Sequence, residues 1–280
     1  MLKRILSTVT LWTVLLGSLY LFGTHAAVFL VTVLAALTLH EFYGMTAKMG
    51  AKPFRWMGLV FSVLIIAGPY VLGFYSDEPD VISSIPTALV VLALIVTCFR
   101  VLGERDPTNR IETIAATVMG LLYVPFMLHF LVAILMREGY EGENLALALW
   151  TIAVSKFCDV GALLTGLAFG KHKMSPTISP KKTWEGAVGG VLVSAGVGAG
   201  IAYFFSSHFS SSLTPLIAAL MALPIAIITI VSDLIESALK RRADTKDTGA
   251  LIPGIGGAFD LTDSLILVAP LAYFMFQFLE

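Results

Sequence analysis

The chain has 280 residues, of which 57% are hydrophobic and only 13% are charged, with a mean hydropathy of +0.88. Soluble domains carry about 25% charged residues, so this composition excludes a soluble globular protein and indicates that most of the surface faces lipid. The formal net charge of −1 identifies no class of partner. The two cysteines, Cys98 and Cys158, lie in apolar runs and support neither a disulfide framework nor a thiolate metal site.

The predicted fold is all-α, because nine apolar runs long enough to cross a membrane follow one another along the chain. A spanning helix needs about 20 mostly apolar residues. The first run follows Lys3 and Arg4, as in a signal peptide, but another run follows almost at once and no convincing cleavage site lies between them. We therefore predict a polytopic membrane protein with about nine transmembrane helices, at approximately 5–24, 26–45, 56–75, 81–99, 113–136, 145–169, 185–206, 213–238 and 259–279.

The distribution of basic residues predicts the orientation of these helices. With the N-terminus inside and the loops alternating between sides, 16 of the 18 lysines and arginines fall on the inner side. The exceptions are Arg137, in an outer loop, and Lys156, within a span. Because cytoplasmic loops carry an excess of Lys and Arg, we expect a cytoplasmic N-terminus, an external C-terminus and polar chemistry on the cytoplasmic face of the inner (plasma) membrane.

The two halves of the chain differ in composition. Residues 1–140, with the first five spans, are largely plain aliphatic and aromatic residues, and we interpret them as scaffold helices. Residues 141–280, with the last four spans, bring charges into the helices and contain many glycines. Spacings such as that of Gly186 and Gly190 let helices approach closely, either within the bundle or in a dimer. We expect the catalytic chemistry in the second half.

Charged residues inside spans are costly and usually functional. Lys156 and Asp159 lie three residues apart, so they share a helix face and form either a neutralising ion pair or part of a site. A second group lies near the end of the run 213–238, where the spacing i, i+3, i+4, i+7 predicts a polar stripe on one helix face. This stripe consists of Asp233, Glu236, Ser237 and Lys240.

Asp260 and Asp263 share one face at the start of the last span. The dipole at a helix N-terminus favours anions, which accounts for part of their presence. Two neighbouring carboxylates nevertheless repel each other, and structural ion pairing is the other explanation for them. Together with Asp233 they would form an oxygen-rich site suited to Mg²⁺, which binds carboxylates, water and phosphate oxygens.

Two basic loops adjoin these helices. Residues 171–183 are rich in lysine and hydroxyl groups, and residues 240–257 combine basic residues with the glycines Gly254, Gly256 and Gly257. Topology and lipid headgroups alone can explain basic loops. Their position beside buried carboxylates favours phosphoryl or nucleotidyl transfer instead, since such sites need carboxylates for a metal and cations for phosphates. His40 and Glu41, beside Phe42 and Tyr43, are interpreted as an interfacial anchor rather than a metal site.

Two long motifs resemble the phosphatidate cytidylyltransferase (CDP-diacylglycerol synthase) family. The C-terminal motif runs from Ser237 to Arg241, continues with Lys246-Asp247 and ends with residues 253–263, Pro-Gly-Ile-Gly-Gly-Ala-Phe-Asp-Leu-Thr-Asp. The upstream motif contains Asp159, Gly166, residues 169–171 and then residues 179–186, Ser-Pro-Lys-Lys-Thr-Trp-Glu-Gly. The resemblance covers about residues 155–270, and the motifs follow each other in the family's order.

The resemblance implies an all-helical membrane enzyme that condenses CTP with phosphatidate to give CDP-diacylglycerol and pyrophosphate. It implies CTP, phosphatidate and membrane lipid as partners, no nucleic acid, and a homodimer. Mg²⁺ would be held by Asp233, Asp260 and Asp263, and a second cation is left open. The implied catalytic residues are Asp233, Asp260, Asp263, Lys240, Arg241, Lys246 and Asp247. The implied substrate-binding residues are Lys181, Lys182, Thr183, Ser237, Arg242, Gly256 and Gly257. Asp159, Glu236 and Lys156 are implied to orient the site residues without touching the substrate.

The chain departs from the family at two positions. Ile255 stands where the family usually has histidine, and Leu261 stands where it usually has arginine. Both departures remove a potential phosphate contact, for which His172, Lys173 or Arg242 could substitute. The acidic residues are all kept, so we expect activity.

Two other functions explain buried charge. A secondary transporter with an ion or proton pathway predicts inverted repeats and charges near the membrane midplane, whereas here the charges cluster toward one face and no repeat is visible. Another lipid-headgroup enzyme, such as a kinase or a CDP-alcohol phosphotransferase, is the second alternative. The Asp-Gly…Ala-Arg…Gly…Asp…Asp pattern of the latter family does not occur in the sequence.

Overall fold

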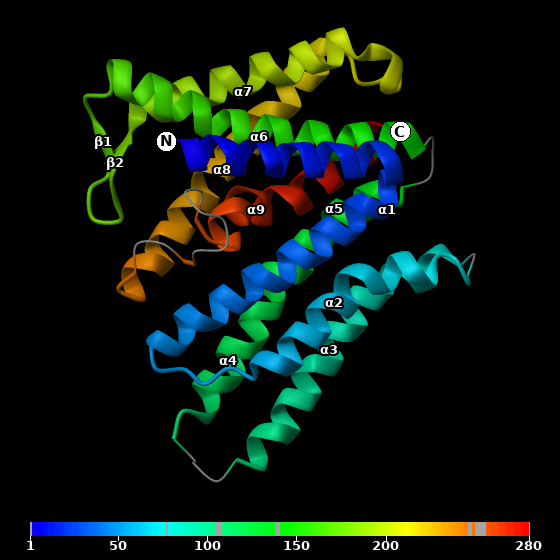
Figure 1. Cartoon of the computed structure of the whole chain (residues 1–280), viewed down its shortest axis with the longest axis vertical. Coiled ribbons are helices and arrows are strands. Elements are labelled where there is room, and N and C mark those ends of the chain that lie inside the picture. Colours follow the sequence, from blue (N-terminus) through cyan, green and yellow to red (C-terminus); the bar gives the residue numbers. More distant parts are fainter. Residues whose placement is uncertain are drawn as a thin grey trace. The chain divides into compact units, whose positions relative to one another are not determined.

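The computed structural model describes residues 2–76, 78–104, 108–137, 141–245, 248–249 and 256–279 and, within them, all side chains except those of residues 2–12, 14–16 and 141. Most of these residues are helical (Figure 1). The elements are α1 (Leu2–Lys48), α2 (Arg55–Leu72), α3 (Pro79–Leu102), α4 (Arg110–Leu121), the π-helix η1 (Leu122–Phe126), α5 (Met127–Leu135), α6 (Glu141–Phe169), β1 (Lys173–Ser175), β2 (Ser179–Thr183), α7 (Trp184–Phe204), the 3-10 helix η2 (Ser206–His208), α8 (Pro215–Arg242), α9 (Ala258–Phe276) and the 3-10 helix η3 (Gln277–Leu279).

Eight helical segments of the described residues are long and apolar enough to cross a membrane. They coincide with the second to the ninth predicted runs, which confirms a polytopic all-α membrane protein. The first predicted run, 5–24, lies mostly among residues whose side chains are not described. It belongs to the part of α1 before Gly23, where the backbone leaves helical geometry with φ 50°. Glycine adopts positive φ without steric cost, and α1 changes direction along its length (Figure 1). The count of nine stays a prediction.

The chain forms two compact units, which are described separately. One consists of Met1–Val132 and Arg242–Thr262, and the other of Ala133–Arg241 and Asp263–Glu280. The boundary passes through α9, so that the first turn of this helix belongs to the first unit and the rest to the second. The division at residue 140 into scaffold and catalytic halves concerns function rather than compactness, and it stays a prediction.

The core of the first unit is built on the second half of α1, which packs against α2, α4 and η1. Phe42 and Tyr43 are buried there, and the Tyr43 hydroxyl donates to the Thr117 carbonyl at 2.8 Å. The Phe42 ring lies against Phe259 in the first turn of α9, and the Thr38 and Thr262 hydroxyls are hydrogen-bonded at 2.9 Å. The start of α9 is therefore packed onto α1, which lies more than 200 residues earlier in the chain.

The second unit is organised by α6 and α7, which lie side by side (Figure 1). A side-chain carbon at Gly186 would meet the Ala162 carbonyl at 2.8 Å, and one at Gly190 would meet the Cys158 carbonyl at the same distance. Glycine permits the close helix approach, as the sequence predicted. The buried Trp150 indole donates to the Gly198 carbonyl at 3.0 Å and so adds a polar link between the same helices.

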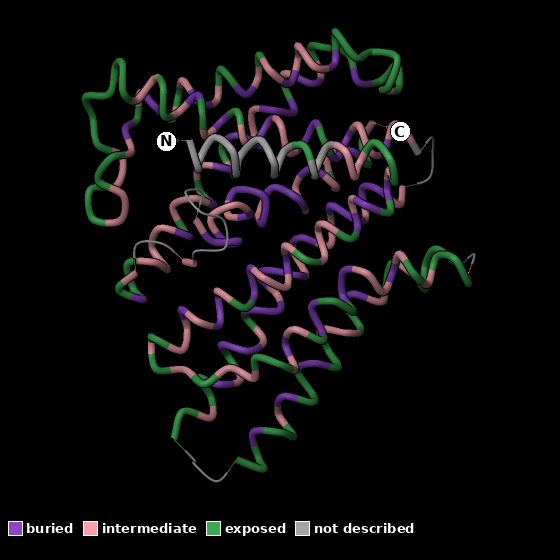
Figure 2. Tube along the Cα trace, in the orientation of Figure 1, coloured by how far each residue is buried: buried purple, intermediate pink, exposed green. Residues whose placement is uncertain are grey.

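Exposed apolar side chains cover much of the helical surface. Along α3, exposed residues prevail over buried ones (Figure 2). The exposed side chains of this helix include Val91, Leu92, Leu94 and Ile95. Such a surface is unfavourable in water and natural in a bilayer, where apolar side chains face hydrocarbon.

The loop at 171–183 contains a feature that the sequence did not predict. Strands β1 and β2 pair antiparallel, with Lys173 opposite Thr183 and Ser175 opposite Ser179. The loop ends in a helix cap, because the Thr183 hydroxyl accepts a hydrogen bond from the Gly186 N–H at 3.1 Å at the start of α7. The hairpin therefore presents its lysines from a paired backbone.

Candidate active site

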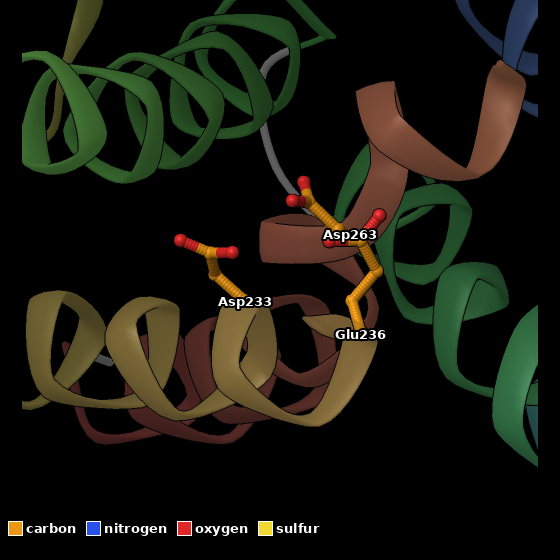
Figure 3. A group of neighbouring side chains, drawn as sticks. All are labelled: Asp233, Glu236 and Asp263. Atoms are coloured by element: carbon orange, nitrogen blue, oxygen red, sulfur yellow. The ribbon is translucent and has the colours of Figure 1, made fainter. Parts of the chain in front are cut away.

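Three carboxylates from two helices form an acidic cluster in the second unit. Asp233 and Glu236 lie one turn apart on α8, and Asp263 lies on α9 (Figure 3). One oxygen from each lies within 4.8 Å of the others. The Ser232 hydroxyl donates to the Asp263 carbonyl, which ties the two helices together at this level. Glu236 is buried, while Asp233 and Asp263 are partly exposed.

Each carboxylate of this acidic cluster has a lysine partner, and the three lysines come from three different elements. Lys182 of β2 lies 2.5 Å from Asp233, and Lys240 of α8 pairs with Glu236. Lys156 of α6 lies 3.4 Å from Asp263 and also donates to the Ser264 hydroxyl at 2.7 Å. A bare set of three carboxylates would repel strongly in a half-buried position, so these ammonium groups stabilise it.

Asp159 is a fourth carboxylate near the acidic cluster and its lysines. It lies within electrostatic range of Lys156, Lys182, Asp233 and Asp263. The ion pair of Lys156 is formed with Asp263, so this lysine links α6 to α9 in addition to its attraction to Asp159. The simple Lys156–Asp159 pair that the spacing allowed is therefore part of a larger network.

The hairpin and the end of α8 are joined by Arg241, whose Nε donates to the Ile178 carbonyl at 3.3 Å. Lys181 and Arg242 are exposed, and Ser237 is half-buried on the same helix as Glu236. The Thr183 hydroxyl oxygen serves as the cap of α7. At the base of the hairpin, Glu185 accepts hydrogen bonds from the Lys171 N–H at 3.1 Å and from the His172 ring at 2.6 Å. Of the predicted basic residues, Lys182 and Lys240 thus contact the acidic cluster, while Lys181 lies at the surface.

The glycine segment before α9 belongs to the first unit. Gly256 has φ +122°, and a side-chain carbon there would meet the Asp260 carboxylate at 2.5 Å. The Gly257 N–H donates to the Asp260 carboxylate at 2.8 Å. The Thr248 hydroxyl lies 3.1 Å from the same oxygen. The Gly257 N–H and the Thr248 hydroxyl therefore both hold the Asp260 carboxylate.

Glu41 contributes a carboxylate that sequence reasoning assigned to an interfacial anchor. That assignment stays a prediction, but Glu41 also accepts hydrogen bonds from the N–H groups of Ala258 at 3.0 Å and Phe259 at 2.9 Å. Thr248 donates to it as well, at 2.9 Å. The available signal was a single acidic residue at the end of an apolar run. Its partners lie more than 200 residues away in sequence, so the pairing itself was not visible.

Comparison with known proteins identifies the family. A family model described as "Cytidylyltransferase family" matches residues 2–279. The chain belongs to the cytidylyltransferase family. A phosphatidate cytidylyltransferase of Thermotoga maritima is 32% identical over 256 residues, covering 89% of this chain and 87% of the relative. The Bacillus subtilis relative of the same name is 30% identical over 198 residues, covering 71% and 70% of the two chains. The one from Synechocystis is 28% identical over 295 residues, covering 97% and 95%.

These similarities confirm the family resemblance of the two motifs and extend it to nearly the whole chain. Within the family assignment, the described residues bring together Asp233, Asp263, Glu236 and the three lysines. Asp260 is placed in the first unit with Gly256 and Gly257. Lys246, Asp247 and Ile255 lie outside the described residues, so their predicted roles stay predictions.

The acidic cluster has the donor chemistry of a divalent-cation site. Carboxylate oxygens are the protein ligands that Mg²⁺ prefers, with the remaining positions taken by water or phosphate. Asp233, Glu236 and Asp263 offer three such groups within a few ångströms of each other. The partial exposure of Asp233 and Asp263 leaves access for a phosphate ligand.

Proposed function

We propose that this chain transfers the cytidylyl group of CTP to phosphatidate, giving CDP-diacylglycerol and pyrophosphate. Membership of the cytidylyltransferase family and the named relatives support the reaction. The observation that carries the proposal onto this chain's own residues is the acidic cluster of Asp233, Glu236 and Asp263 with a lysine on each carboxylate. Carboxylates for a metal and cations for phosphates are the parts that such a transfer needs.

The reaction exchanges one phosphoanhydride bond for another. An oxygen of the phosphatidate phosphate attacks the α-phosphorus of CTP, a new P–O–P bond forms, and the bond to the β-phosphate breaks so that pyrophosphate leaves. The attacking phosphate is already an anion and needs no strong base. The main barrier is the repulsion between two polyanions, so catalysis depends on positive charge that is fixed in place beforehand.

Asp233 and Asp263, with Glu236 beside them, would hold Mg²⁺, and Asp260 is proposed as a further ligand on the basis of the family motif. When bound, the ion supplies charge neutralisation and stabilises the leaving pyrophosphate. Asp159 and Lys156 orient the acidic cluster from α6. Whether a second cation binds is left to metal titration.

The lysines have a second task in this proposal. Lys182 and Lys240 are paired with carboxylates of the acidic cluster, and their proximity to a proposed metal there supports a role in binding CTP phosphates. We assign phosphate binding to them and to Arg241 and Lys246, with Asp247 beside them. Further contacts are assigned to Lys181, Thr183, Ser237, Arg242 and the backbone of Gly256 and Gly257.

The site is proposed to face the cytoplasm, where CTP is found, from a multi-pass protein of the plasma membrane. Phosphatidate would enter sideways from the inner leaflet among the last four spans. The N-terminus would be cytoplasmic and the C-terminus external. The protein is proposed to form a homodimer. A cysteine introduced at Ser175 should react with an impermeant reagent only from the cytoplasmic side, and labelling from outside would contradict this orientation.

One assay tests the reaction itself. Purified protein in mixed detergent micelles is given radiolabelled CTP and Mg²⁺, with and without phosphatidate. The expected result is label in a lipid product and release of pyrophosphate only when phosphatidate is present. Absence of phosphatidate-dependent incorporation in a folded preparation would overturn the proposal.

A further inference from the structure

Glu41 lies about two turns before the end of α1, beside residues that are firmly packed. The residues after it, Phe42 and Tyr43, are 3% and 0% exposed, and Tyr43 is hydrogen-bonded to Thr117. The Glu41 carboxylate itself is half-buried and reaches the first turn of α9. A half-buried carboxylate loses hydration and needs hydrogen-bond donors in exchange.

Three neutral donors satisfy this carboxylate. Oε1 accepts from the Ala258 N–H at 3.0 Å, and Oε2 accepts from the Phe259 N–H at 2.9 Å and from the Thr248 hydroxyl at 2.9 Å. The two N–H groups belong to the first turn of α9, where N–H groups have no partner within the helix. The negative charge also interacts favourably with the helix dipole at this end.

Two glycines, Gly249 and Gly257, also lie against the Glu41 carboxylate. A side-chain carbon at Gly249 or at Gly257 would collide with the Glu41 carboxylate oxygens. Any residue larger than glycine at these two positions would therefore displace the Glu41 side chain or the backbone at that glycine. Two separate pieces of chain on either side of residues 250–255 thus contact one side chain of α1.

The contacts continue from Glu41 to Asp260. The Thr248 hydroxyl lies between Glu41 Oε2 and Asp260 Oδ2, at 2.9 Å and 3.1 Å. A hydroxyl has one proton and donates to one of them at a time, so the two carboxylates share this donor. Gly257, which adjoins the residues that Glu41 holds, donates its N–H to Asp260 at 2.8 Å. Groups that Glu41 positions therefore contribute to the orientation of Asp260.

We propose that Glu41 is a positioning residue for cytidylyl transfer, which holds Thr248, Gly257 and the first turn of α9 so that the Asp260 carboxylate is kept in one orientation for metal binding. This inference rests on the proposed function and on the role assigned there to Asp260. Removing a residue that hydrogen-bonds to a metal ligand and orients it lowers metal affinity or activity by about 10- to 100-fold. A cap that only stabilised the helix would change stability and leave the response to metal unchanged.

The test compares Glu41→Gln with Glu112→Gln. Glutamine keeps the size of the side chain, but its NH₂ group cannot accept, so at least one of the three donors loses its partner. Glu112 is exposed and lies in the first turn of α4, so its substitution makes the same chemical change at another helix start. The Mg²⁺ concentration for half-maximal activity should rise about 10- to 100-fold in Glu41→Gln and stay at the wild-type value in Glu112→Gln.

A second readout does not depend on turnover. Melting temperature is measured in detergent while Mg²⁺ is titrated without substrates, and the half-saturating Mg²⁺ concentration of Glu41→Gln should shift in the same direction as in the assay. Thr248→Ala, which removes only the shared hydroxyl, should shift both values by a smaller amount. If Glu41→Gln does not yield folded protein, Thr248→Ala and Glu41→Asp are judged by the same two measurements.

The outcomes separate this inference from the proposed function. An inactive wild type would overturn the proposed reaction, while the Mg²⁺-dependent melting curves would still test Glu41. An active wild type with unchanged Mg²⁺ dependence in the folded variants would overturn the role of Glu41. A lower melting temperature combined with an unchanged half-saturating Mg²⁺ concentration would likewise show a structural cap only.

Discussion

Two groups of carboxylates in this protein are stabilised in different ways. In the acidic cluster of the second unit, Asp233, Glu236 and Asp263 are each paired with a lysine. In the first unit, Glu41 and Asp260 are held by backbone N–H groups and the Thr248 hydroxyl. Charged partners can be exchanged for a metal ion, since the cation replaces one positive charge with another. Backbone N–H groups and a hydroxyl carry no charge to exchange and set an orientation instead. We propose that the acidic cluster binds the metal ion and that Glu41 positions Asp260, the further ligand.

The largest effect is expected from removing a charge of the acidic cluster. Asp263→Asn keeps the shape of the side chain but removes a proposed metal ligand and the ion pair of this residue with Lys156. Turnover should fall by about 1,000-fold or more, which corresponds to about 4 kcal/mol of barrier. The exposed Asp80, in the first turn of α3, offers Asp80→Asn as a matched control with wild-type turnover. Substantial activity of Asp263→Asn at ordinary Mg²⁺ would exclude Asp263 as a ligand.

A smaller effect is expected at the hairpin, where two adjacent lysines differ in their surroundings. Lys182 is paired with Asp233, whereas Lys181 is exposed. Lys182→Met should lower kcat/KM for CTP about tenfold more than Lys181→Met, a difference of about 1.4 kcal/mol. Steady-state kinetics with varied CTP measure both variants under one condition. Equal losses in the two would show that the pairing with Asp233 has no bearing on nucleotide binding.

The smallest effect is expected where the chain departs from its family. Leu261 lies in the first turn of α9, next to Asp260, and is half-buried. If other cations already bind the phosphates, Leu261→Arg should change the KM for CTP by no more than about tenfold, or 1.4 kcal/mol. A much larger gain in activity would indicate that the wild type lacks a phosphate contact and works far below its capacity.

Much of the architecture could be predicted because it follows from local properties of the sequence. Length and apolar composition predicted the spans, and helical spacing placed Asp233 and Glu236 on one face, as the structure confirms. The hairpin at 173–183 was not predicted, because its two short strands are polar and lack the alternation that marks a half-buried strand.

The partners of the carboxylates were harder to predict than the carboxylates themselves. Lys182 reaches Asp233 from a hairpin 51 positions earlier, and Lys156 reaches Asp263 across 107 positions. Periodicity identifies only neighbours within one element, so these pairs became visible only when the elements were packed. Glu41 shows the same limit most clearly, since its contacts join α1 to residues 207–218 positions later.

The role of the acidic cluster is tested most directly by removing divalent cations from the active wild type. Incorporation of CTP into lipid is followed after treatment with EDTA and again after Mg²⁺ is added back. Phosphatidate-dependent incorporation should disappear with EDTA and return with Mg²⁺ in the wild type, and it should stay absent in Asp263→Asn. Incorporation that continues at the wild-type rate without divalent cations would contradict the assignment of Asp233 and Asp263 to a metal site.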